Sequence, residues 1–169
     1  FMTMVKKGYV PVYRNSERVF GDVFQDGLGR PAMRVVLTGQ DGKRYEAIVH
    51  GLVGDDEGEI DLPLLTDWPN RPRQKVDHDE GKPSLTRWRV LSRDAASTTT
   101  RLQLEPVTGR SHQLRVHMQA LGHPILGDAL YAPADVVAQA NRLLLHARAL
   151  AFAHPASGEW VCFEAPAPF

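Results

Sequence analysis

The chain has 169 residues, of which 43% are hydrophobic and 24% are charged, and its formal net charge is zero. These values are typical of one globular domain with a buried core. A neutral chain has no overall charge with which to attract nucleic acid, so such binding would need a local basic patch. The single cysteine, Cys162, excludes an internal disulfide. Because no apolar run is long enough to span a membrane or to form a signal peptide, we expect a cytoplasmic protein, and a monomer.

The N-terminal part of the chain carries the weakest structural pattern. Residues 10–14 are compatible with a strand, and residues 32–39 predict a strand closed by a turn. Between them, residues 18–31 mix aromatic side chains with glycine and aspartate, which predicts turns. The chain also starts with phenylalanine rather than methionine. We therefore interpret residues 1–42 as the divergent or truncated part of a single domain that spans residues 1–169.

Clearer patterns follow. Tyr45, Ala47 and Val49 alternate with other residues, which predicts a strand that carries these three side chains on one face. The acidic residues 55–61 predict a solvated loop. Residues 62–76 are rich in proline and predict an irregular loop laid over the scaffold. Long irregular loops in compact domains often carry function.

The rest of the chain predicts four strands and two helices. The strands are expected at residues 84–93, 99–107, 143–154 and 159–165, and the helices at residues 111–121 and 134–141. In the first helix Leu114, Met118 and Leu121 recur at helical spacing. We expect Ser111 to cap the N-terminus of this helix and Gly122 to end it in a left-handed conformation. The sum is an α+β fold with a mainly antiparallel, mixed sheet and short helices.

Positive charge is concentrated between residues 69 and 115, which hold ten basic and five acidic residues. An excess of five positive charges in a neutral chain is compatible with a stripe that contacts phosphates. It is equally compatible with an ordinary solvated surface.

The densest polar run is residues 109–131, GRSHQLRVHMQALGHPILGDALY. His112, His117 and His123 raise the hypothesis of a metal site. Residues five apart on a helix point in different directions, however, and no cysteine or acid other than Asp128 stands nearby at ligand spacing, so we predict no metal. Ser111 beside His112 raises the hypothesis of a hydrolase, but the run lacks a nucleophile-elbow pattern.

Arg110 and Tyr45 each admit two interpretations. Arg110 follows a tight turn at the entry to the predicted helix. Its guanidinium could pair with a buried carboxylate or a phosphate, or lie free on the surface. Tyr45, in the middle of a strand, is compatible with a core aromatic residue or with a platform on which a base stacks.

Four motifs, in this order along the chain, resemble those of the RluA-type pseudouridine synthases. Residues 43–51, KRYEAIVHG, resemble the family's K-x-Y-x-A-x-V-x-G strand. Residues 61–76, DLPLLTDWPNRPRQKV, with the GKPSLTRWRVL that follows, resemble the loop and strand of the RluA subgroup. Residues 109–131 resemble the family's G-R-[ST]-H-Q-[IL]-R-x-H helix with G-H-P-[IL]-x-G-D-x-x-Y, and residues 142–166 resemble its C-terminal strands. The resemblance covers residues 43–169.

The resemblance implies isomerisation of uridine to pseudouridine in ribosomal or transfer RNA, without a cofactor or a metal. The target base is flipped out of its helix, the N1–C1′ bond breaks, the uracil rotates, and C5 bonds to C1′. Carried over to this chain, Tyr45 would stack on the flipped uracil and Leu114 would line the pocket beside it. Arg110 would form a buried ion pair with the catalytic aspartate. Further contacts to the RNA backbone are expected from Arg71, Arg73, Lys75 and Arg115.

The family's catalytic aspartate lies in an H-R-L-D-x-x-T-S-G motif upstream of the tyrosine strand, and this chain lacks the motif. Asp26, which precedes a glycine-rich turn and an apolar run, is the first candidate for the nucleophile, and Asp22 is the second. The alternative is a catalytically inactive RNA-binding relative, or a fragment, without the nucleophile. Because a buried cation without a partner is costly, we expect Arg110 to lie within ion-pair distance of a carboxylate in a competent site.

Overall fold

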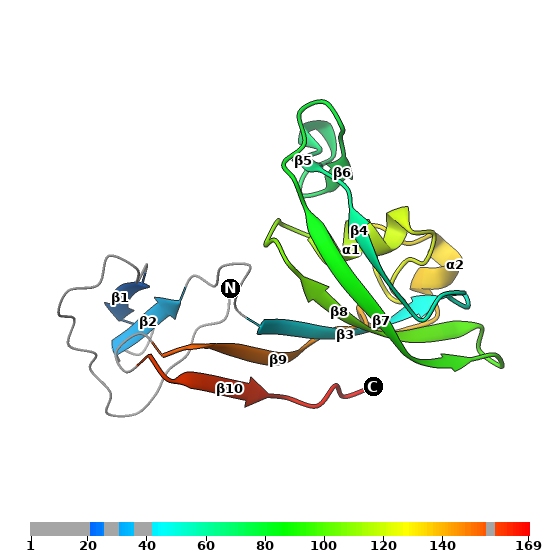
Figure 1. The fold of residues 1–169 in the computed structure, drawn as a ribbon. Helices are drawn as coiled ribbons and strands as arrows, with labels where there is room; N and C mark the ends of the chain where they lie inside the picture. Colours follow the sequence, from blue (N-terminus) through cyan, green and yellow to red (C-terminus); the bar gives the residue numbers. More distant parts are fainter. Residues whose placement is uncertain (1–20, 26–30, 36–41, 155–157) are drawn as a thin grey trace.

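The centre of the fold is a six-stranded sheet, in a computed structural model that describes residues 21–25, 31–35, 42–154 and 158–169. The strand order is β10-β9-β3-β8-β7-β4, and every described pairing is antiparallel (Figure 1). Its strands are β3 (Gly42–His50), β4 (Glu57–Asp61), β7 (Leu85–Asp94), β8 (Thr99–Pro106), β9 (Leu145–Ala153) and β10 (Trp160–Glu164). The expected α+β class with a mainly antiparallel sheet is confirmed.

Two smaller sheets and three short helical segments complete the described chain. The strands β1 (Gly21–Gln25) and β2 (Pro31–Val35) pair with each other, as do β5 (Leu64–Thr66) and β6 (Gln74–Val76). The helical segments are η1 (Trp68–Asn70), α1 (Gln113–Ala120) and α2 (Ala134–Val137). The β5–β6 hairpin projects beyond one end of the large sheet (Figure 1), and α1 lies against β6, β7 and β8. No helix in the described residues is long and apolar enough to cross a membrane.

The main core lies between the inner face of the large sheet and α1. As the alternation predicted, Ala47 and Val49 on β3 are fully buried, and Tyr45 packs against the same cluster. The neighbouring strands and the helix contribute Trp88, Leu102, Leu104, Leu114 and Met118. Burial of these apolar side chains is the main force that holds α1 against the sheet.

The two ends of α1 behave differently from each other. The helix begins at Gln113, its N-cap position is held by His112 with φ of 54°, and no side chain caps it. The prediction that Ser111 is the cap is therefore wrong. At the C-terminal end Gly122 has φ of 88°, as predicted, and its N–H donates to the Gln119 carbonyl over 3.0 Å. A positive φ is uncommon for a residue other than glycine, so contacts elsewhere must hold the turn at His112.

Three segments that were expected to be irregular contain strands. Residues 55–61 include β4, because Ile60 is buried in the core and the strand pairs with β7. Residues 62–76 form the β5–β6 hairpin around η1 instead of a loop. Residues 18–31 include β1. In the first two cases cross-strand pairing with distant residues overrode the local signals of acidity and proline.

Gly58 on β4 is required by a close approach to Trp88 on β7. A Cβ atom at Gly58 would lie 2.7 Å from Cζ2 and 2.9 Å from Cε2 of the indole. Trp88 is buried, and its Nε1 has no hydrogen-bond partner among the described residues. The indole therefore fills the core directly beneath the backbone of the edge strand.

Gly58→Ala is expected to destabilise the fold by about 1–3 kcal/mol, because the ring or the edge strand must move to admit the methyl group. Urea unfolding measures this loss. Gly54→Ala is the control, since a Cβ there meets nothing within 4 Å. The penalty should shrink in a Trp88→Phe background, and an unchanged penalty there would contradict the steric explanation.

Candidate functional site

Two of the residues predicted for the site, Leu114 of α1 and Tyr45 of β3, meet in the main core cluster. Leu114 is buried in that cluster, and Tyr45 packs against it. Arg110 stands four residues before Leu114, at the turn that leads into α1. Tyr45 is half-buried, and burial raises the pKa of its hydroxyl. Among the described residues, none forms a hydrogen bond with that hydroxyl.

Arg110 is exposed, which contradicts the expected buried position. Its Nε donates to the Pro83 carbonyl over 3.3 Å. Within residues 42–154 and 158–169, no carboxylate lies within ion-pair distance of its guanidinium. The described part of the chain thus presents the arginine of the predicted site without its acidic partner.

The two candidates for the nucleophile stay untested. Asp26 lies outside the described residues. Asp22 lies on β1, where its backbone pairs with Arg34 of β2. The sequence hypotheses for both aspartates therefore remain hypotheses.

The β5–β6 hairpin carries an exposed aromatic residue among cations. Trp68 is 66% exposed, and the Arg71 guanidinium lies 4.5 Å from the centre of its ring. The Asn70 side chain donates to Asp67 over 2.9 Å and braces the same turn. Arg73 lies over the ring of Tyr131, at 5.6 Å. An exposed indole beside arginines is the combination on which nucleic-acid bases stack, and the sequence analysis had not singled out Trp68.

Lys75 and Arg115, two of the predicted RNA contacts, are each paired with an aspartate. Lys75 Nζ lies 2.8 Å from Asp77, and the lysine of this pair is exposed while the aspartate is partly buried. Arg115 binds Asp128 with two hydrogen bonds, of 2.9 and 2.6 Å. Asp128 is 1% exposed and also accepts the backbone N–H groups of residues 130 and 131. Burial alone would raise the Asp128 pKa, but Arg115 and these N–H groups outweigh it and hold the pKa below its usual value.

Tyr131 joins the hairpin to the turn before α1. Its hydroxyl accepts the Gln74 N–H over 2.8 Å and lies 2.7 Å from His112 Nδ1. The Arg115 guanidinium lies 4.9 Å from the centre of its ring. These contacts help to hold His112 in its left-handed conformation.

The three histidines of the metal hypothesis do not converge. His112 contacts Tyr131, His117 contacts Thr86, and His123 Nδ1 lies 2.9 Å from the His50 carbonyl. The described residues contain no group of three or more histidine, cysteine, aspartate or glutamate side chains placed to hold a metal ion.

His117 is fully buried, and its hydrogen bonds fit the neutral form of the imidazole ring. Its Nε2 lies 3.1 Å from the Leu62 carbonyl and therefore donates, so its Nδ1, 2.9 Å from Thr86 Oγ1, accepts the hydroxyl proton. Burial lowers the His117 pKa from 6.5, against smaller opposing effects of the Leu62 carbonyl and Asp61. The folded state thus binds fewer protons at this group than the unfolded chain.

The stability of the protein is therefore expected to fall as the pH drops below about 6.5, the pKa of an unfolded histidine. Above that pH both states carry a neutral imidazole and the contribution of His117 is constant. Urea unfolding at pH 7.5 and pH 5.5 measures the difference. His117→Gln should lower stability at pH 7.5 but reduce the further loss at pH 5.5. An equally steep loss in this variant would show that other groups cause it.

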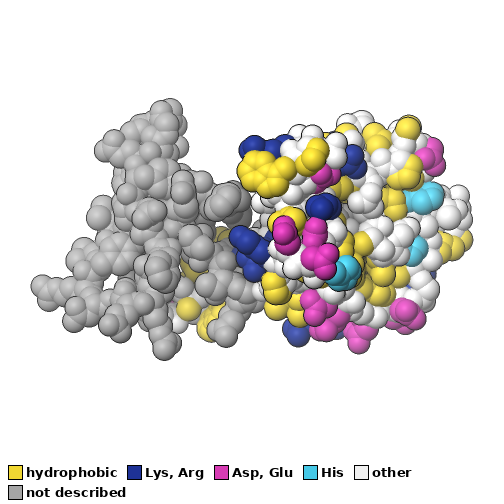
Figure 2. All heavy atoms as spheres, turned by 90° about the horizontal axis from the view of Figure 1, so that it is seen from above, with side chains coloured by type: hydrophobic (Ala, Val, Ile, Leu, Met, Phe, Trp, Pro, Cys, Tyr) yellow, Lys and Arg dark blue, Asp and Glu magenta, His cyan; other side chains and the backbone are white. Residues whose placement is uncertain are grey.

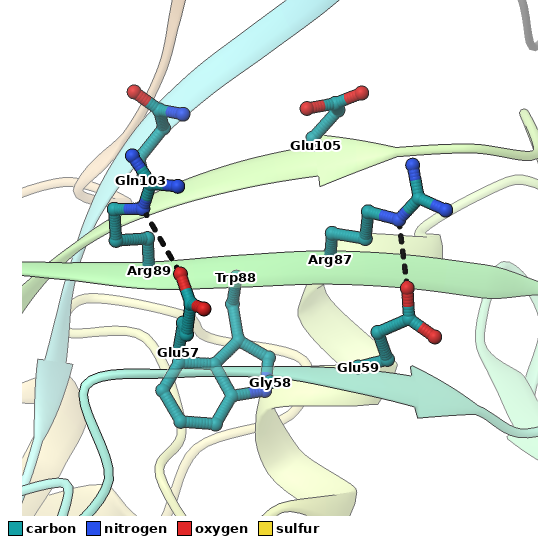
Figure 3. A pocket seen from close by; sticks show the side chains of 8 residues that line it. All are labelled: Glu57, Gly58, Glu59, Arg87, Trp88, Arg89, Gln103 and Glu105. Atoms are coloured by element: carbon teal, nitrogen blue, oxygen red, sulfur yellow. Dashed lines mark hydrogen bonds and ion pairs between the residues drawn. The ribbon is translucent and has the colours of Figure 1, made fainter.

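A depression on the outer face of the sheet is lined by paired charges. Figure 3 shows Arg87 and Arg89 on the side of β7 opposite the Trp88 indole. Arg87 pairs with Glu59 at 2.7 Å and Arg89 with Glu57 at 3.4 Å. Such exposed pairs neutralise one another, and this face offers little net charge to a ligand.

The basic stripe predicted between residues 69 and 115 is therefore much narrower in the structure. Arg93 pairs with Asp56 and Arg101 with Glu46, both acids from outside the span. The basic residues of the span that make no ion pair with a described residue are Arg71, Arg73, Lys82 and Arg110. Arg71 and Arg73 lie on the hairpin, Lys82 forms a β-bridge with Leu64 of β5, and Arg110 lies in the turn before α1. Figure 2, which looks down on this end of the molecule, shows basic side chains beside hydrophobic ones.

A family model described as RNA pseudouridylate synthase matches residues 39–120. The dual-specificity RNA pseudouridine synthase RluA of Pasteurella multocida is 56% identical over 127 residues, which are 75% of this chain and 58% of that protein. The protein of the same name from Escherichia coli K12 gives the same values. That of Vibrio cholerae is 58% identical over 115 residues, 68% of this chain and 46% of that protein. The chain thus spans less than two thirds of the length of these relatives.

Two solved human structures have a similar fold. Human RNA pseudouridylate synthase domain containing 1 superposes with a TM-score of 0.68 and 28% identity, over 83% of this chain and 65% of that one. Human RNA pseudouridylate synthase domain containing 4 superposes with a TM-score of 0.61 and 22% identity, over 83% of this chain and 67% of that one. The second likeness concerns the fold alone.

Proposed function

The chain belongs to the family of RluA-type pseudouridine synthases, and on that basis we propose that it isomerises uridine to pseudouridine in RNA. The observation that carries the proposal is the packing of Tyr45 against the core cluster that holds Leu114, a residue of the helix whose entry turn carries Arg110. An aromatic ring and a leucine thus lie in one apolar cluster. A flipped uracil needs a stacking partner and a dry wall of this kind.

Each residue has one role in the proposed reaction. Tyr45 stacks on the uracil, and Leu114 lies beside it. The carboxylate of Asp26, or of Asp22 in its place, attacks C1′ as the N1–C1′ bond breaks, and Arg110 pairs with that carboxylate. The base rotates, and C5 bonds to C1′ as the carboxylate leaves and is regenerated. C5 then releases its proton to water and N1 ends protonated, so no oxidant, metal or cofactor is needed.

The proposed substrate is a stem-loop of ribosomal or transfer RNA, bound by a monomer of one domain in the cytoplasm. The contact surface consists of three cations and one aromatic residue around the hairpin: Arg71, Arg73, Lys82 and Trp68. The three cations make no ion pair with a described residue, so their charges can meet phosphates. Lys75 and Arg115 reach phosphates only by sharing their charge with Asp77 and Asp128. Binding through these cations should weaken steeply with salt.

Release of tritium from C5-labelled uridine tests the reaction. The full chain is incubated with labelled ribosomal and transfer RNA, as are its Asp26→Asn and Asp22→Asn variants. Release that disappears in one variant identifies the nucleophile. Release that survives both substitutions would contradict the role of these aspartates.

A second function is favoured by one observation. Arg110 is exposed and pairs with no described carboxylate, as expected for an inactive relative that binds RNA through the same surface. Absence of tritium release from the parent chain, with salt-dependent RNA binding retained, would establish this alternative.

A further inference from the structure

Gln113, the first residue of α1, uses the whole hydrogen-bonding capacity of its side-chain amide. It is only 3% exposed. Its Oε1 accepts the Thr108 hydroxyl at 2.8 Å and the Arg110 N–H at 3.0 Å. Its Nε2 donates to the Leu85 carbonyl at 2.9 Å and to Thr86 Oγ1 at 3.0 Å. A buried amide with four partners has one orientation and cannot turn without losing several bonds.

The two bonds of Oε1 close a ring with the turn before the helix. The Gln113 N–H donates to the Arg110 carbonyl over 3.2 Å, while the Arg110 N–H donates to the Gln113 side chain. Backbone and side chain thus bind Arg110 from both directions. The ring encloses His112, whose φ of 54° is unusual and needs such support.

The two bonds of Nε2 anchor this ring to the large sheet. Leu85 and Thr86 are the first residues of β7, and both are bound by the same amide group. Thr108 adds a parallel link, because its Oγ1 accepts the Leu85 N–H over 3.0 Å. The turn is therefore fixed to the sheet by polar bonds, in addition to the apolar packing of α1.

The side chain of Arg110 depends on this turn for its direction. Apart from the 3.3 Å bond of Nε to the Pro83 carbonyl, no described residue holds its guanidinium. Pro83 lies just before Leu85 in the chain, so this bond also ties the side chain of Arg110 to the start of β7. A shift of the turn relative to β7 would move the guanidinium away from whatever carboxylate or phosphate it meets.

We propose that Gln113 is the positioning residue for Arg110: its amide fixes the turn at residues 108–112 against β7 and so sets where the Arg110 guanidinium stands. The inference rests on the proposed function for its catalytic consequence. It predicts that loss of the Gln113 amide reduces turnover, although Gln113 touches no substrate. Substrate affinity changes little, because the hairpin cations that bind RNA are not attached to this amide.

The test compares Gln113→Met with Thr100→Val in the full chain. Methionine keeps the length of the side chain and loses all four bonds. Thr100 is also buried, and its hydroxyl donates to the Gly51 carbonyl and accepts the Val53 N–H, at the end of β8 opposite the turn at residues 108–112. Thr100→Val therefore removes buried hydrogen bonds without touching the turn. Two readouts are taken: kcat and KM of tritium release, and hydrogen exchange of the Arg110 backbone N–H.

If the parent chain releases tritium, kcat of Gln113→Met should fall by about 100-fold, the usual consequence of a misplaced catalytic group, with KM within about twofold. Thr100→Val should keep the parent kcat. An unchanged kcat in Gln113→Met, or an equal loss in both variants, overturns the proposal. If the parent releases no tritium, the proposed function fails and hydrogen exchange decides the positioning role alone. That role is supported if the Arg110 N–H exchanges faster than in the parent chain in Gln113→Met but not in Thr100→Val. Protection of this N–H in Gln113→Met equal to that in the parent overturns the role.

Discussion

Asp128→Ala is expected to destabilise the fold by about 3–5 kcal/mol, the largest loss that we predict for any single substitution. The change leaves the Arg115 guanidinium, whose side chain is 16% exposed, without its partner. It also removes the acceptor of the N–H groups of Leu130 and Tyr131. Chemical unfolding, monitored by tryptophan fluorescence, measures the difference in unfolding free energy.

Asp56→Ala is the matched control for this substitution. Asp56 also pairs with an arginine, Arg93, at 2.8 Å, but its side chain is 87% exposed. Removal of an exposed partner costs about 0–1 kcal/mol, because water replaces the lost contact. Equal losses for the two variants would contradict the view that burial makes the Arg115–Asp128 pair sensitive. The depressed pKa of Asp128 agrees with a stabilising role of its carboxylate. The stability that the ionised group confers is lost only as the pH falls below about 3.8.

Most of the fold was predictable wherever periodicity reported on burial. The alternation at Ala47 and Val49 and the helical spacing of Leu114 and Met118 each correspond to buried positions in the structure. Prediction was wrong where a partner far along the chain decides the outcome. Glu57 and Glu59 lie in a strand because β7 pairs with them and supplies arginines, and no local window contains that information.

The same reason explains the basic stripe. A count along the chain assigns five excess positive charges to residues 69–115. Arg87, Arg93 and Arg101 are neutralised by acids of β3, β4 and the segment before β4, which stand beside them only after folding. The basic residues that make no ion pair with a described residue form a smaller set, which lies at the hairpin and at the turn before α1.

The candidate site was predictable in its residue types but not in its support. Motif resemblance selected Tyr45, Arg110 and Leu114, and the structure brings Tyr45 and Leu114 into one cluster. The motif resemblance did not indicate that the turn before α1 is held by Gln113, because a glutamine in a helix gives no periodic or compositional signal. Ser111 gave the stronger local signal for a cap, yet no side chain caps the helix, and the turn before it is bound by the buried amide of Gln113.

Arg110→Met is expected to reduce the kcat of tritium release by roughly 10²–10³-fold, the usual cost of removing one charge that stabilises a reacting group. The fold should be almost unaffected, within about 0.5 kcal/mol, because Arg110 is exposed and its side chain is bound only at Pro83 among the described residues. A loss of kcat without a loss of stability separates a catalytic role from a structural one.

Arg142→Met is the control for charge. Arg142 is also exposed, and its guanidinium lies over the ring of Phe169, at 5.5 Å, away from the turn before α1. If positive charge acts only by attracting RNA, both substitutions should raise KM alike and leave kcat unchanged. If Arg110 acts on a carboxylate at the reacting nucleotide, only its substitution lowers kcat, and Arg110→Lys should restore part of the rate, because an ammonium keeps the charge but not the planar geometry of the guanidinium. A kcat that stays at the parent level in Arg110→Met would reduce Arg110 to a contact for the RNA backbone.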